Sequence, residues 1–169
     1  MREAVIVSTA RTPLTKSHRG EFNATPGPQL AAYSVKAAVE RSGIEPELIE
    51  DLVMGCGYPE GITGKNIGRQ TALRAGLPLS VAGMVASRFC ASGLQSVAIA
   101  AGRIVAEGVP AMVAGGVESI SAIRAGNPAD IDPWLQEHKP DLFMAMIDTA
   151  DIVAPVSYTH LTLPTSDLV

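Results

Sequence analysis

Short apolar runs alternate with longer segments of helical periodicity through most of this chain. The runs, which are largely apolar and show no polar alternation, lie at residues 4–9, 51–55, 83–86 and 111–114. Runs of this length are typical of strands buried on both faces, as in a parallel sheet. Helical spacing over about 29–42 and 66–75 ends at Gly43 and Gly76, which suit helix C-termini. The alternation predicts an α/β fold, with a mostly parallel, layered sheet covered by helices on its faces.

The third apolar run leads into the segment RFCASGLQ at residues 88–95. Cys90 is therefore expected at a strand-to-helix junction, on or near the first turn of a helix. Unpaired N–H groups and the positive end of the helix dipole favour a thiolate there, and such a cysteine is a candidate nucleophile. The alternative is a buried structural cysteine, the usual place of a free thiol. Local context leaves both interpretations open.

The helix expected after Cys90, over about 90–105, is apolar on nearly every side. Beyond its first turn the polar side chains are Gln95, Ser96 and Arg103. A helix of this kind is expected in the middle of a protein, covered on all sides.

Composition and charge exclude several classes of function. The 169 residues suit one domain, and a net charge of −4 without a basic patch argues against nucleic-acid binding. Two distant cysteines without a CxxC pair, together with scattered histidines, predict no metal site and a reducing compartment. The loop GITGKN at 61–66 lacks P-loop spacing, and no GxGxxG follows a strand, so no nucleotide site is expected.

The two ends of the chain bear on targeting and on domain organisation. A strand pattern is already running at residue 6, and no apolar run approaches the ~18 residues of a membrane span. We therefore expect no signal peptide and no membrane contact, and a cytoplasmic protein. Prolines and Trp134 over 123–140 predict an excursion from the sheet, followed by a helix near 141–153.

The last 15 residues, PVSYTHLTLPTSDLV at 155–169, differ in character from the rest. Pro155 interrupts a helical pattern that is still running, and no periodicity follows. Our hypothesis is that the native sequence ends near Ala154 and that the tail is a cloning junction.

Five segments, in order, resemble the amino-terminal half of the thiolase family over about residues 3–154. They are EAVIVSTARTP, GKNIGRQTALRAGLP, SRFCASGLQSVAIAAGRI, VAGGVESIS and MIDTAD. Three positions depart from the family pattern: Ser87 stands for a usual Asn, Ile120 for a common Met and Asp151 for Glu. The resemblance implies a thiolase-like layered fold, with the amino-terminal domain at 1–121, the start of a loop domain at 122–154 and a non-native tail at 155–169.

The resemblance also implies a chemistry. Thiolases move acyl groups between coenzyme A thioesters through an acyl-cysteine, and the motif match makes Cys90 that nucleophile, with its backbone N–H facing the oxyanion. Met146 would line the acyl pocket, although core filling would explain it equally well. Coenzyme A is then a substrate, no resident cofactor is expected, and the full-length protein would be a homodimer or homotetramer whose third strand is a plausible dimer edge.

The family's other catalytic groups lie in Gly-His-Pro, Cys-x-Gly-Gly and Asn-Glu-Ala-Phe motifs, and none of these occurs in the chain. We therefore expect a truncated chain with no turnover by itself. Within the family, 3-ketoacyl-CoA cleavage in fatty-acid breakdown is favoured over a biosynthetic, acetoacetyl-CoA-forming enzyme. A ketoacyl synthase and a non-catalytic thiolase-like lipid-binding protein are the further alternatives.

Four other polar residues are assigned no chemistry. Cys56 is expected as a small core residue at the end of a strand, and Glu118 is expected to brace the end of the fourth strand. His18 and His138 lie in polar surroundings with no partner that the sequence can assign.

Overall fold

The structure, a computed structural model, describes residues 2–122 and 131–157. The chain divides into two compact units, Met1–Arg124 and Ala125–Val169. Each unit is described by itself below.

The first unit is built on a parallel sheet of three strands among its described residues. The strands are β1 (Ile49–Gly55), β2 (Ala82–Ala86) and β3 (Ala111–Gly116). Their spatial order is β2-β1-β3, with both neighbours parallel to β1. In this register Val53 of β1 lies opposite Met84 of β2 and Ala114 of β3. The predicted parallel α/β architecture is confirmed.

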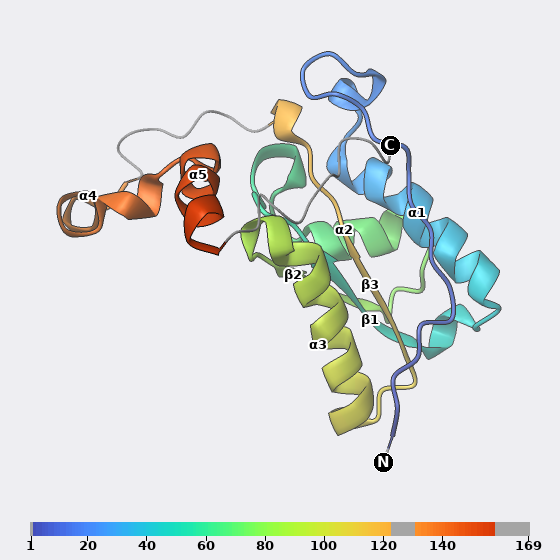
Figure 1. Cartoon of the computed structure of the whole chain (residues 1–169). Helices are drawn as coiled ribbons and strands as arrows, with labels where there is room; N and C mark the ends of the chain where they lie inside the picture. Colours follow the sequence, from blue (N-terminus) through green and yellow to red (C-terminus); the bar gives the residue numbers. More distant parts are fainter. Residues whose placement is uncertain (1, 123–130, 158–169) are drawn as a thin grey trace. The chain divides into compact units, whose positions relative to one another are not determined.

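Three helices cover this sheet: α1 (Gly27–Ser42), α2 (Ile67–Arg74) and α3 (Ser92–Glu107). Because β2 and β3 lie on opposite sides of β1, the chain moves across the sheet in one direction from β1 to β2 and in the opposite direction from β2 to β3. Right-handed crossovers therefore place α2 and α3 on opposite faces. Figure 1 shows α1 and α2 together on one side of the sheet and α3 on the other.

The ends of α1 and α2 follow from local chemistry. Gly43 ends α1 in the left-handed conformation, at φ 67°, and Gly76 follows α2 at φ 82°, which confirms both predicted stops. Asn66 caps the start of α2, because its side chain accepts a hydrogen bond from the backbone N–H of Arg69.

The core of the first unit lies between the sheet and the pair α1 and α2. Leu52, Val53 and Met54 of the central strand are fully buried. Ile67 of α2 and Val35 of α1 belong to the same core, Ile67 being fully and Val35 almost fully buried. The central strand is thus buried on both faces, as its unbroken apolar sequence indicates.

Residues 4–9 do not form the predicted strand. Val5, Ile6 and Val7 are between 60 and 76% exposed, and the segment lies across a cleft of about 790 Å³ from β3. A strand requires a neighbour that pairs with its backbone groups. β3 is an edge strand of the described sheet, but the segment is separated from it by the cleft and does not pair with it.

The described residues of this chain do not cover the apolar helix on all sides. Only one side of α3 is covered: Ser92, Ser96 and Ala100 are buried, whereas Leu94 is 75% exposed. The reason is that the single sheet of this unit contacts one face of the helix. The open face is apolar, which marks it as a surface suited to contact with further protein.

Among residues 2–122 and 131–157, one helical segment, Phe89–Glu107, is long and apolar enough to cross a membrane by length and composition, with mean hydropathy 1.4. The expectation of no such segment rested on the lack of an uninterrupted apolar run, and Arg103 and Glu107 interrupt the apolar sequence of this helix. This is weak evidence for a membrane, since a core helix of a soluble protein passes the same test. Arg103 forms ion pairs with Glu50 and Asp51 at 2.8 and 2.9 Å, which tie α3 to β1.

The second unit contains two described helices, α4 (Pro133–His138) and α5 (Met146–Ser157). The helix predicted near 141–153 is present, but it begins at Met146 and continues past Pro155. The expectation that Pro155 ends the helix is therefore wrong. The proline lies in the last turn, where it removes one backbone hydrogen bond to residue 151 and no later turn depends on it. Residues 123–130 and 158–169 lie outside the described residues, and the predicted boundaries at 121 and 154 stay predictions.

The approach of α3 to β1 is testable at Gly55. A Cβ on Gly55 would lie 2.4 Å from the backbone carbonyl of Ser92 and 2.5 Å from the nitrogen of Gly93. Gly55→Ala must push α3 off the sheet, and we expect it to lower the free energy of unfolding by about 1–3 kcal/mol in a urea titration. Gly102→Ala is the matched control, because a Cβ there meets nothing within 4 Å and should stabilise the helix. Equal effects of the two substitutions would contradict the close approach.

Candidate functional site

Cys90 lies in a 3₁₀ turn, Phe89–Ala91, which joins β2 to α3. Its side chain is exposed and borders a shallow pocket of about 380 Å³. The pocket is lined by residues that follow the carboxyl ends of the strands or open α3: Gly55, Gly57, Tyr58, Phe89, Cys90, Ser92, Gly93, Gly116, Val117, Glu118 and Ile120. Parallel α/β sheets bind ligands at this edge. The exposed position excludes the buried structural cysteine that the sequence left open.

The turn that carries Cys90 is held in an unusual backbone conformation. Phe89 has φ +46°, in the left-handed region that bulky residues rarely adopt. Ser92 stabilises this turn, because its Oγ accepts from the Arg88 N–H at 2.8 Å and donates to the Phe89 carbonyl at 2.6 Å. Strain of this kind persists only where the surroundings impose it, and it is concentrated at functional sites.

The start of α3 lies next to Cys90 and carries the positive end of the helix dipole. Its N-cap residue is Ala91, which has no side chain able to pair with the free amides. The positive end of this helix of 16 residues is therefore not neutralised by a side-chain cap. Ser96 anchors the first turns of α3 through a 2.8 Å hydrogen bond from its Oγ to the Gly115 carbonyl of β3. The helix terminus is thus fixed beside the thiol.

Glu118 holds the loop that follows β1. Its carboxylate accepts the Gly57 N–H at 2.6 Å and the Tyr58 N–H at 3.3 Å, and it lies 3.5 Å from the Cys56 sulfur. The sequence predicted a bracing role for Glu118 at the end of its own strand. The structure shows a brace that reaches across the sheet edge to the loop after β1.

This loop also contacts the segment around the turn that carries Cys90. The Ser87 hydroxyl donates to the Gly57 carbonyl at 3.1 Å, and the rings of Tyr58 and Phe89 meet edge to face with centroids 5.8 Å apart. The sequence did not predict these contacts. Neighbouring parallel strands bring the residues after their carboxyl ends to one edge, and that rule would have grouped Gly57 with Glu118 once the strand order was known.

Cys56 is buried, whereas Cys90 is exposed. Cys56 is 1% exposed at the end of β1, which confirms that it is a core residue. Burial, and secondly the Glu118 carboxylate, raises the pKa of the Cys56 thiol to about 11. At neutral pH the Cys56 side chain is therefore a thiol and a poor nucleophile.

Of the remaining candidates, His18 of the first unit is not among the residues that line the Cys90 pocket. His18 takes part through its backbone N–H, which donates to the Ser121 hydroxyl at 2.9 Å. In the second unit, His138 stacks on Trp134 with ring centroids 4.6 Å apart, and its Nδ1 lies 3.0 Å from the Trp134 carbonyl. Met146 begins α5 and is 70% exposed. Its role in an acyl pocket stays a prediction.

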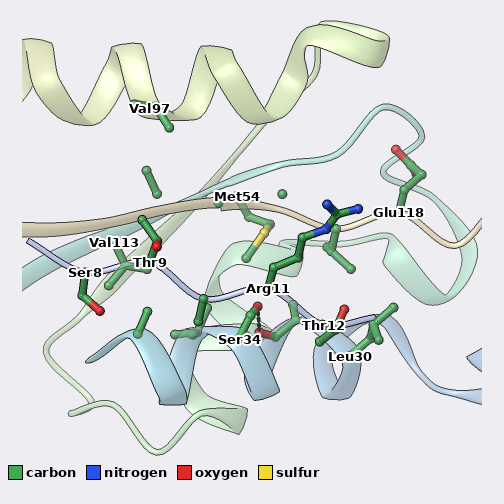
Figure 2. Close-up of a pocket in the computed structure, with 18 of the residues that line it drawn as sticks. Ser8, Thr9, Arg11, Thr12, Leu30, Ser34, Met54, Val97, Val113 and Glu118 are labelled. Carbon is green, nitrogen blue, oxygen red and sulfur yellow. Dashed lines mark hydrogen bonds between the residues drawn. The ribbon is translucent and has the colours of Figure 1, made fainter. Parts of the chain in front are cut away.

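A larger cleft of the first unit adjoins the Cys90 pocket, and Gly116, Val117, Glu118 and Ile120 line both. It runs between the segment 4–13, α1, α3 and β3, and Figure 2 shows Arg11, Met54 and Val113 among its lining residues. Cys90 is not among the residues that line it. The Cys90 side chain therefore borders only the smaller of these two pockets.

The contrast between the two cysteines predicts selective alkylation. With iodoacetamide at neutral pH, Cys90 should be modified while Cys56 stays intact, because Cys56 is both buried and protonated. Peptide mass spectrometry of the reacted chain measures both sites, and Cys90→Ala serves as the control. Modification of Cys56 before Cys90 would contradict the assignment.

The raised pKa of the Cys56 thiol predicts that the stability of the fold changes at high pH. The pKa of Cys56 is raised to about 11 in the folded state from 9.0, so its protonated form contributes stability that is fully present below pH 9 and lost as the pH rises to 11. We expect urea unfolding to show a fall in stability across this range that is smaller in Cys56→Ala. Equal falls in both proteins would show that other groups cause it.

Comparison with known proteins places these features in a family. The chain matches the family described as "Thiolase, N-terminal domain" over residues 4–156. It is 39% identical over 155 residues to a 3-ketoacyl-CoA thiolase of Bacillus subtilis (strain 168), a match that covers 91% of this chain and 40% of that protein. It is 43% identical over 122 residues to an acetyl-CoA acetyltransferase of Cupriavidus necator, covering 72% of this chain and 30% of that protein.

A 3-ketoacyl-CoA thiolase of Acinetobacter baumannii (strain AYE) is 34% identical over 137 residues, covering 81% of this chain and 35% of that protein. The chain thus spans 30 to 40% of the length of these three relatives. The resemblance read from the five motifs is confirmed: the chain belongs to the thiolase family, whose N-terminal domain it matches from residue 4 to residue 156.

Proposed function

We propose that this chain supplies the acyl-carrying nucleophile of an acyltransferase that acts on coenzyme A thioesters. The observation that carries the proposal is the position of Cys90, which is exposed on a strained turn at the uncapped start of α3. Relatives named 3-ketoacyl-CoA thiolase and acetyl-CoA acetyltransferase support this class of substrate. The favoured reaction is thiolytic cleavage of a 3-ketoacyl-CoA.

The proposed reaction has two covalent steps. The Cys90 thiolate attacks the 3-keto carbon, a sulfur–carbon bond forms, and the bond between carbons 2 and 3 breaks. The electron pair stays on carbon 2, which takes a proton and leaves as acetyl-CoA. The thiol of free coenzyme A then gives up its proton and attacks the acyl-cysteine, which releases acyl-CoA and restores the Cys90 thiolate. The reverse sequence condenses acyl-CoA with acetyl-CoA.

The residues of this chain contribute binding and orientation to both steps. A thiolate serves as attacking group in the first step and as leaving group in the second, so one cysteine is sufficient. The backbone N–H of Cys90, just before α3, is suited to donate to the oxyanion of each tetrahedral intermediate. The small residues Ala91 and Gly93 leave room for the thioester carbonyl. Met146 is proposed to contact the acyl chain.

Proton transfer in this scheme needs groups beyond those of the Cys90 pocket. Among the residues that the structure describes, neither a histidine nor a second cysteine lines this pocket, and the Gly-His-Pro, Cys-x-Gly-Gly and Asn-Glu-Ala-Phe motifs do not occur in the sequence. We propose that these groups come from the remainder of a longer protein and that the chain by itself does not turn over. That protein would use coenzyme A as substrate without a resident cofactor, and would be cytoplasmic, homodimeric or homotetrameric, and not bound to a membrane.

One alternative is favoured by a specific observation. The relatives include acetyl-CoA acetyltransferases, so an acetoacetyl-CoA-forming, biosynthetic enzyme is the second candidate. The structure gives no comparable support to a ketoacyl synthase. A non-catalytic lipid-binding protein has no use for an exposed cysteine at a helix start, and the retained Cys90 argues against it.

Acetyl-CoA tests the proposal with this chain directly. We expect incubation to place one acetyl group on Cys90 through thioester exchange, and intact-mass and peptide mass spectrometry locate it. Cys90→Ala should stay unmodified, and Cys56→Ala should react like the unchanged chain. No sustained cleavage of acetoacetyl-CoA is expected. An acetyl group on any other residue would refute Cys90 as the acyl carrier, and sustained cleavage would refute the need for further catalytic groups.

A further inference from the structure

We propose that Glu118 is a positioning residue for Cys90, acting through the Gly57 peptide and Ser87. The inference rests on the proposed function, because it concerns how the nucleophile of that reaction is held. Its basis is an uninterrupted chain of contacts from Glu118, two residues after β3, to the segment before α3.

The first part of this chain is the Glu118 carboxylate. Each of its oxygens accepts a backbone N–H, from Gly57 at 2.6 Å and from Tyr58 at 3.3 Å. The Glu118 residue is exposed, so the carboxylate remains hydrated on its other side while it fixes the direction of two successive peptides. Hydrogen bonds to an ionised acceptor are stronger than neutral ones.

Gly57 is the second part, and it transmits the constraint. Its N–H binds Glu118, and its carbonyl accepts the Ser87 hydroxyl at 3.1 Å. Gly57 is buried, and a Cβ at this position would lie 2.8 Å from the Glu118 carboxylate and 3.3 Å from the Phe89 carbonyl oxygen. The glycine therefore packs between the carboxylate and the nucleophile turn, and no larger residue would permit that approach.

Ser87 is the third part, three residues before Cys90. Its hydrogen bond fixes one end of a turn whose central residue, Phe89, has the unfavourable φ of +46°. The ring contact between Tyr58 and Phe89 adds a second attachment from the same loop. Without these attachments the turn can relax toward an ordinary conformation, and Cys90 would move from its place beside the start of α3.

A positioning role and a purely electrostatic role predict opposite effects. Glu118 lines the same pocket as Cys90. If the negative charge of Glu118 alone mattered, its removal would weaken the repulsion of an attacking sulfur anion and speed up the reactions of Cys90. If Glu118 positions the turn, its removal slows them. A merely structural role would lower the thermal stability of the chain and leave the reactivity of the folded protein unchanged.

The test uses the rate of Cys90 alkylation by iodoacetamide, measured on the folded chain by peptide mass spectrometry. Glu118→Gln replaces one of the two acceptor oxygens with an NH₂ group, and Ser87→Ala removes the hydroxyl donor. We expect each to slow alkylation roughly threefold to tenfold, the size that corresponds to one lost hydrogen bond. Ser87→Asn should restore the rate, because its amide can donate to the same carbonyl. Glu60→Gln, an equal charge change at an exposed residue of the same loop, should have no effect.

Each outcome decides the inference. Slower alkylation in Glu118→Gln and Ser87→Ala, with recovery in Ser87→Asn, supports it. An unchanged or faster rate in Glu118→Gln overturns it, as does an unchanged rate in Ser87→Ala. If circular dichroism shows that Glu118→Gln does not fold, the two Ser87 variants decide alone. The readout needs no acyl transfer, so failure of acetylation by acetyl-CoA would refute the proposed function separately.

Discussion

The structure depends most on the close packing of α3 against the end of β1. Gly55 allows the backbone of Ser92 and Gly93 to approach a strand residue at distances that any side chain would prevent. Because β1 is the central strand, with β2 and β3 on its two sides, this contact fixes the start of α3 over the carboxyl edge of the sheet. The exposed thiol of Cys90 occupies its site as a consequence of that packing.

The same edge explains why two cysteines of one chain have different properties. Cys56 ends a buried strand and lies against Glu118, and burial and that charge keep it protonated. Cys90 lies on a turn outside the sheet, next to amides that no side chain caps. The backbone geometry therefore exposes one thiol and packs the other in the core, and Glu118 contacts Cys56 and lines the pocket that Cys90 borders.

The sequence predicted the parts of this structure that depend on local chemistry. The strand at 51–55, the helix stops at Gly43 and Gly76, and the junction at Cys90 are set by apolar runs, by glycine at positive φ and by small residues. The sequence predictions failed where the structure depends on contacts between segments that are far apart in the sequence. Residues 4–9 have the pattern of a strand but are separated by a cleft from the free edge of β3, and the described residues cover the apolar α3 on one face only. The contacts among Glu118, Gly57 and Ser87 were not predictable either, because they depend on the spatial order of strands that are far apart in sequence.

The central claim is that Cys90 carries the acyl group during turnover by the full-length protein. Rapid acid quenching during the reaction with a 3-ketoacyl-CoA, followed by peptide mass spectrometry, tests it most directly. The account predicts an acyl group in thioester linkage to Cys90 that forms and decays at the rate of turnover. Steady turnover with the acyl group on a different residue, or undiminished turnover by a Cys90→Ala variant, would contradict it.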